Sequence, residues 1–137
     1  MKYQIISTRH VRKNVVIVST KDIYNLVKRY ARLKQETFIV ITLTTNMHVI
    51  SMNIISLGLL DRSLAHPREV FRSAFLDNAH SIIIAHNHPS GNVEPSAQDH
   101  HLYAKLLEAS KTLGIPIFDN VIFTNNDFVS FRDKKYV

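Results

Sequence analysis

The stretch that most constrains this chain runs from residue 81 to residue 99 and reads SIIIAHNHPSGNVEPSAQD. It begins with a short apolar, largely β-branched run, Ser81 to Ala85, and continues into a loop rich in turn-forming residues. Such a run is typical of a strand that is buried on both faces of a sheet. Because successive side chains of a strand alternate between faces, His86 and His88 point to the same side, about 6–7 Å apart along the chain. The segment therefore places two imidazoles where one metal ion can take both.

The loop after His88 leads to a predicted helix start. Pro95 and Ser96 favour the beginning of a helix, and Asp99 falls in its first turn, from which a carboxylate can face back toward the strand end. Two neutral imidazoles and one carboxylate suit a catalytic zinc ion, because the fourth tetrahedral position is left for water. Iron, nickel and cobalt accept a similar set. The predicted cofactor is Zn²⁺.

Each part of this pattern also has a simpler explanation. Ser96-x-x-Asp99 is close to an ordinary capping box, in which Asp99 satisfies only backbone N–H groups. A pair of histidines at a strand end is often exposed to solvent or held in a core without any metal. The combination of a buried strand, paired imidazoles, a tight turn and a carboxylate on the next helix favours the metal site over these separate explanations.

The same residues carry a resemblance to a known family. The pattern His86-x-His88 followed by Ser96-x-x-Asp99 resembles the zinc-metallopeptidase signature of the JAMM (MPN-plus) class, and the string HNHPSG looks like that of the bacterial RadC family. Similar segments occur at 66–71 (HPREVF), 113–119 and 130–132, so that the resemblance covers about residues 36–132. It implies an α/β fold with a mixed sheet flanked by helices, of JAB/MPN-like (cytidine-deaminase-like) architecture. We expect one such domain over residues 1–137, without the helix-hairpin-helix module that full-length RadC proteins usually carry.

The resemblance also implies roles for individual residues. By it, the metal ligands are His86, His88 and Asp99, Ser96 assists at the oxyanion, and an upstream glutamate that aligns with Glu36 is the general base. Glu36 precedes the apolar run Phe38 to Ile41. The alternative is that Glu36 is only a charged residue at the end of this strand and faces water.

Two positions depart from the family pattern without touching these residues. Asn120 stands where the family commonly has histidine, and Leu59 stands where it commonly has threonine.

Composition limits the other classes of function. The chain has no cysteine, which excludes a disulfide framework, a cysteine zinc site and the paired cysteines of zinc deaminases. It shows no signal peptide and no apolar stretch long enough to span a membrane, so we expect a soluble, cytoplasmic protein. The net charge is +6, and nine of the 17 Lys and Arg residues lie before residue 35, where Asp22 is the only acidic residue. This basic region can meet DNA, or it can be an ordinary solvated helix face.

The hydrophobic pattern predicts interleaved strands and helices. Strands are expected at 3–7, 15–18, 36–44, 48–56, 81–85, 116–123 and 128–131, and helices at 20–33, 67–78 and 96–113. The leading hypothesis is a zinc-dependent metallohydrolase of the JAMM type that cleaves an amide of a protein or peptide substrate. The alternative is a DNA-repair-associated, nucleic-acid-binding accessory protein, and a third possibility is a scaffold that retains metal for folding without turnover.

Overall fold

A computed structural model describes residues 5–11, 14–57 and 66–136, in which the chain forms a six-stranded mixed sheet of order β1-β3-β2-β4-β5-β6. β4 and β5 pair in parallel, and the other neighbouring strands pair antiparallel. The strands are β1 (Ile5–Val11), β2 (Thr37–Leu43), β3 (Val49–Leu57), β4 (Ser81–Asn87), β5 (Ile117–Phe123) and β6 (Phe128–Ser130).

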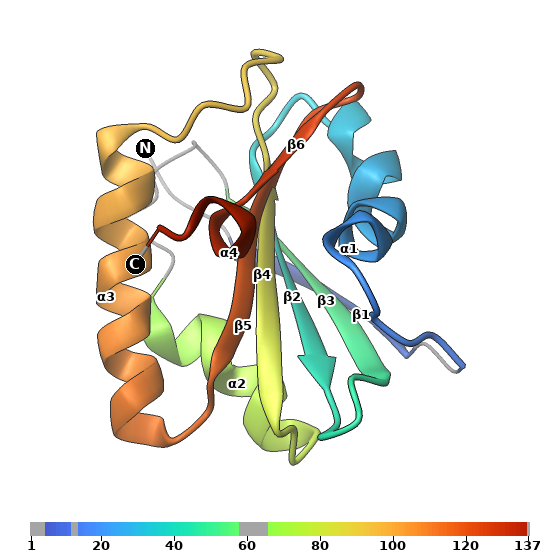
Figure 1. Cartoon of the computed structure of the whole chain (residues 1–137), viewed down its shortest axis with the longest axis vertical. Coiled ribbons are helices and arrows are strands. Elements are labelled where there is room, and N and C mark those ends of the chain that lie inside the picture. Colours follow the sequence, from blue (N-terminus) through green and yellow to red (C-terminus); the bar gives the residue numbers. More distant parts are fainter. Residues whose placement is uncertain (1–4, 12–13, 58–65, 137) are drawn as a thin grey trace.

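Helices cover both faces of this sheet. They are α1 (Thr20–Val27) with the 3-10 helix η1 (Lys28–Arg32), α2 (Pro67–Leu76), α3 (Ala97–Leu113) and the short α4 (Phe131–Lys134). Figure 1 shows α1 on one side of the sheet and α2 and α3 on the other. The predicted fold class, a mixed sheet flanked by helices, is therefore confirmed.

Strand β4 lies near the middle of the sheet and is buried along its whole length. Ile83 and Ala85 pack in the cluster that α1 closes, whereas Ile82 and Ile84 pack in the cluster that α2 and α3 close. Burying an isoleucine side chain stabilises the fold by about 1.5–3 kcal/mol relative to leaving it exposed. These opposed contacts fix which face of β4 each residue occupies, and with it the face of His86.

One predicted strand, Val15 to Val18, is wrong. Of these residues Val16 makes only an isolated bridge to His48, and Val18 is 85% exposed. The chain turns here because the carboxylate of Asp22 accepts hydrogen bonds from the backbone N–H groups of Val18 and Ser19, which starts α1. The bridge, in which the N–H of Ile17 donates to the Met47 carbonyl, therefore stops there, because the cap takes the next backbone donor, that of Val18.

Several predicted ends also differ from the structure. The first strand, expected to end at residue 7, extends to Val11. The helix expected to reach residue 33 leaves the α-helical form after Val27 and tightens into η1. Phe131, expected in the last strand, instead begins α4, because the Ser130 hydroxyl accepts a hydrogen bond from the backbone N–H of Asp133. The predictions for residues 3–4, and the family position at Leu59, lie outside the described residues.

We predict that Ser130→Ala destabilises the protein by about 1–3 kcal/mol, because the buried hydroxyl of Ser130 also donates a 2.6 Å hydrogen bond to the carboxylate of Asp119. Urea unfolding measures the change. Thr112→Ala is the control, since it removes an exposed hydrogen bond to Glu108 and should cost far less. Equal losses in both variants would contradict the assigned role of Ser130.

Candidate metal centre

The end of β4 and the start of α3 bring two imidazoles and a carboxylate together. His86 Nε2 lies 3.3 Å from Asp99 Oδ1, and His88 Nε2 lies 3.1 Å from Asp99 Oδ2. One ligand atom from each residue lies within 4.8 Å of the others. In a tetrahedral zinc site with bonds of about 2.0–2.1 Å, neighbouring ligand atoms lie about 3.3–3.4 Å apart. The spacing of this group is therefore close to what one ion requires.

The group is shielded from water. His86 and Asp99 are 1% and 2% exposed, and the side chain of His88 is 9% exposed. Within the part of the chain that the structure describes, the Nε2 atoms of both histidines are buried and make no hydrogen bond. Because buried polar nitrogens rarely lack a partner, two such atoms that face one carboxylate fit a shared cation.

Neighbouring groups hold both rings in place. His86 stacks on the ring of Phe38 from β2, with ring centroids 4.9 Å apart. His88 Nδ1 lies 2.7 Å from the carbonyl oxygen of Asn92, to which it donates when protonated. That hydrogen bond leaves the lone pair of the neutral ring on Nε2, the atom that faces Asp99. Gly91, at φ +88°, lets the loop turn so that the Asn92 carbonyl reaches back to His88.

Asp99 caps α3 and faces the histidines at the same time. Its Oδ2 accepts a 2.8 Å hydrogen bond from the backbone N–H of Ser96, and its own backbone N–H donates to the Ser96 hydroxyl at 3.1 Å. The capping-box explanation is therefore correct, but it does not compete with a ligand role. The cap fixes the rotamer of the carboxylate that the two imidazoles meet.

The charges of the group depend on one another. Burial alone would raise the pKa of Asp99, but the adjacent imidazoles of His86 and His88 lower it well below its ordinary value. Burial lowers the pKa of His88, but Asp99, the Asn92 carbonyl and Glu36 together raise it above its ordinary value of 6.5. The pKa shifts of Asp99 and His88 thus show that these side chains form one electrostatically coupled group.

Glu36 lies beside this group. It is 4% exposed and immediately precedes β2, where Phe38 pairs with His86. The alternative of a strand-end charge that faces water is therefore excluded. Because β2 and β4 run antiparallel, the same register continued by two residues sets Glu36 opposite His88, and Glu36 is among the groups that raise the pKa of His88. The structure thus brings to the histidines the glutamate that the resemblance pointed to.

Ser96 stands at the rim of the group rather than inside it. The residue is exposed, and its hydroxyl oxygen accepts the capping hydrogen bond from the backbone of Asp99. A hydroxyl that accepts in this way keeps its own hydrogen for donation. It can therefore donate toward a substrate while it caps the helix.

Sequence reasoning did not single out Asn87, between the two histidines. Its side chain is fully buried and hydrogen-bonds to the segment on both sides of Glu36. The available signal was a polar residue at an inward position of an otherwise apolar strand.

Asn120, which departs from the family pattern, is buried on β5 opposite Ile84, and its Oδ1 makes no hydrogen bond within the described residues. Histidines at five other positions are exposed and lie outside the ligand group: His48, His66, His80, His100 and His101.

The fold and the site together define a class: an α/β protein in which the end of a central strand and the start of the following helix bring together a group that could hold a metal ion. Comparison with known proteins gives the family. The family model described as "RadC-like JAB domain" matches residues 17–136, and the chain belongs to this family.

Individual relatives agree with this assignment. A UPF0758 protein of Methanosarcina acetivorans is 42% identical over 122 residues, which is 88% of this chain and 53% of the relative. A UPF0758 protein of Protochlamydia amoebophila is 41% identical over 127 residues, covering 92% of this chain and 55% of that protein. The chain thus spans about half the length of the curated relatives it matches. No helix among the described residues is both long and apolar enough to cross a bilayer.

We predict opposite pH trends for the metal-free and zinc-loaded protein. Because the pKa of His88 is higher in the folded than in the unfolded protein, protonation of His88 stabilises the metal-free fold below about pH 6.5. This contribution is lost as the pH rises through the folded-state pKa. Zinc needs neutral imidazoles, so its stabilisation grows over the same rise and reaches about 2.7 kcal/mol at free zinc 100-fold above Kd.

Thermal melts of chelated and zinc-loaded protein across this pH range measure both trends. His48→Gln, which alters an exposed histidine, is the control and should leave both slopes unchanged. A zinc increment that does not depend on pH would contradict the assignment of His88 to the ion.

Proposed function

We propose that this protein is a zinc-dependent metallohydrolase of the JAMM type that cleaves an amide or isopeptide bond of a protein or peptide substrate. One observation carries the proposal: two imidazoles each lie 3.1–3.3 Å from an oxygen of one buried carboxylate, and a second buried carboxylate, Glu36, lies beside them. Membership of the RadC-like JAB family supports it.

Zinc is the metal that the ligand set suits best. Two nitrogens and one oxygen form a set of borderline softness, and three protein ligands leave one tetrahedral position open. When bound, zinc lowers the pKa of a water molecule toward 7 and polarises the carbonyl of a substrate. The residues that hold it are His86, His88 and Asp99.

The chain's own residues supply the proton transfers. Glu36, buried next to His88, accepts the proton of the attacking water and passes it to the leaving amine. The hydroxyl of Ser96 donates a hydrogen bond to the oxygen of the carbonyl as negative charge develops there. The hydrogen bond from His88 Nδ1 to the Asn92 carbonyl keeps the ring in the tautomer that binds metal through Nε2.

We predict that His88→Ala and Glu36→Gln separate metal binding from turnover. His88→Ala removes a ligand and should lose stoichiometric zinc, whereas Glu36→Gln should keep zinc and lower amide hydrolysis by about 10²–10⁴-fold. Metal analysis of purified protein and hydrolysis of isopeptide-linked and linear peptide libraries measure the two effects.

The control is Glu94→Gln, which changes an exposed carboxylate of the neighbouring loop and should keep both zinc and activity. If the wild-type protein holds stoichiometric zinc but cleaves no amide, the ion has a structural role. If it holds no transition metal, the proposal fails.

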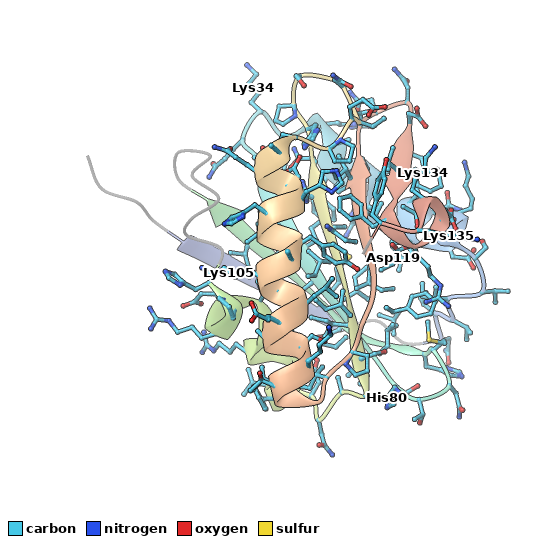
Figure 2. All side chains as sticks on the ribbon, turned by 60° about the vertical axis from the view of Figure 1, so that its left-hand side comes forward. Lys34, His80, Lys105, Asp119, Lys134 and Lys135 are labelled. Carbon is cyan, nitrogen blue, oxygen red and sulfur yellow. The ribbon has the colours of Figure 1, made fainter. Side chains whose placement is uncertain are left out.

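A second candidate function rests on a separate observation. Four basic residues that lie within seven positions are exposed on η1 and the segment after it: Lys28, Arg29, Arg32 and Lys34. No ion pair in the described part of the chain joins them to a carboxylate. Lys34 lies at the same end of the molecule as the start of α3, whereas His80 lies at the opposite end (Figure 2). This exposed basic segment suits a nucleic-acid backbone.

We predict that, if this basic segment binds DNA, changing Lys28, Arg29 and Arg32 to Gln weakens the affinity. The slope of the logarithm of the binding constant against the logarithm of the salt concentration should become less steep by about 0.9 for each phosphate that is no longer neutralised. Fluorescence anisotropy with duplex DNA at several salt concentrations is the measurement. The triple change at Lys105, Lys111 and Lys134 alters net charge equally and is the control. The second function is ruled out if binding is absent at low salt, or if both triple variants weaken it equally.

A further inference from the structure

Asn87 occupies the position between the two histidines of the metal centre. Because neighbouring residues of a strand face opposite sides, its side chain lies on the face of the sheet opposite to those of His86 and His88. The side chain is fully buried. It therefore cannot touch the metal or a substrate, and it needs another explanation.

Among the described residues, the side-chain hydrogen bonds of Asn87 all go to one segment. Its Oδ1 accepts a 2.7 Å hydrogen bond from the backbone N–H of Thr37, and its Nδ2 donates to the carbonyl oxygens of Leu33 and Gln35 at 3.2 and 3.3 Å. Gln35 and Thr37 are the two chain neighbours of Glu36. One side chain thus clamps the backbone before and after Glu36.

Asn87 holds a segment that the hydrogen-bond ladder between β2 and β4 does not reach. The ladder between β2 and β4 begins at the pair Phe38 and His86, so that residues 33–36 lie before it. On the β4 side, the Asn87 amide continues the hydrogen bonding one step beyond the ladder. Asparagine suits this task because its short side chain offers one acceptor and two donors. Aspartate would keep only the acceptor, and alanine would keep neither.

We propose that Asn87 is a positioning residue that fixes the carboxylate of Glu36 in register with the two histidines. The inference rests on the proposed function, in which Glu36 is the general base. The tripeptide His86-Asn87-His88 then has two faces: one presents the metal ligands and the other sets the place of the base. A shift of about 1 Å at such a group can cost about 10²-fold in rate.

The first test separates positioning from stability. Asn87→Ala should keep stoichiometric zinc and lower amide hydrolysis by about 10²-fold per folded molecule. The control is Asn53→Ala, which removes another buried asparagine whose Nδ2 donates to the Val40 carbonyl and the Ser51 hydroxyl, away from residues 33–37. A purely structural role predicts that both variants lose stability alike and keep their activity per folded molecule.

A double-mutant cycle tests whether Asn87 acts through Glu36. In a Glu36→Gln background, Asn87→Ala should cause little further loss, because the base it positions is already gone. A multiplicative loss in the double variant would overturn the proposal. Asn87→Asp, which keeps the acceptor for the Thr37 N–H but not the donors, should fall between the wild type and Asn87→Ala.

Two measurements test, without any turnover, whether Asn87 holds the backbone on either side of Glu36. Amide hydrogen exchange at Thr37 should become about tenfold faster in Asn87→Ala and remain unchanged in Asn53→Ala. In cobalt-loaded protein, paramagnetic relaxation of the Glu36 side-chain carbons should weaken in Asn87→Ala, as the carboxylate moves away from the ion.

These outcomes keep the two proposals apart. If the wild type cleaves no amide, the hydrolase proposal fails, while exchange at Thr37 and relaxation at Glu36 still decide whether Asn87 places that carboxylate. If the wild type binds no cobalt, exchange at Thr37 decides alone. The clamp is overturned if Asn87→Ala leaves both the Thr37 exchange rate and the Glu36 relaxation as in the wild type.

Discussion

The contact between the Asp99 carboxylate and the two imidazoles at the end of β4 is the interaction on which this site depends. Asp99 reaches the histidines because the capping box with Ser96 fixes its rotamer at the first turn of α3. The same hydrogen bonds begin the helix and aim the ligand. Changing Asp99 would therefore disturb both the helix start and the ligand set, whereas changing His88 affects the site more selectively. A local folding signal thus also positions a candidate metal ligand.

The sheet supplies the rest of the geometry. Apolar side chains on both faces of β4 lock the strand between α1 on one side and α2 and α3 on the other, which decides the side on which His86 lies. The antiparallel neighbour β2 places Phe38 against the His86 ring and brings Glu36 to the strand end. The candidate site therefore draws on three segments, of which two, the strand end and the helix start, belong to the continuous stretch 81–99.

This continuity explains what could be predicted. His86, His88 and Asp99 lie within fourteen residues, so that strand alternation and a helix start were enough to place them together. Glu36 is fifty residues away from His86, and only the family resemblance pointed to it, because the β2–β4 pairing that brings it close is not visible in one sequence. Asn87 was missed because its partners are backbone groups of that same distant segment. The errors at residues 15–18 and at Phe131 arose where the side-chain caps of Asp22 and Ser130 override hydrophobic pattern.

The central claim is that two imidazoles and one carboxylate hold a single cation and leave one position open. A crystal structure of the zinc-loaded protein, with diffraction data collected on both sides of the zinc absorption edge, tests it most directly. The account predicts one anomalous peak bonded to His86 Nε2, His88 Nε2 and an oxygen of Asp99, with an oxygen that is not from protein in the fourth position. A peak elsewhere, or no peak while His88 and Asp99 remain paired, would contradict it.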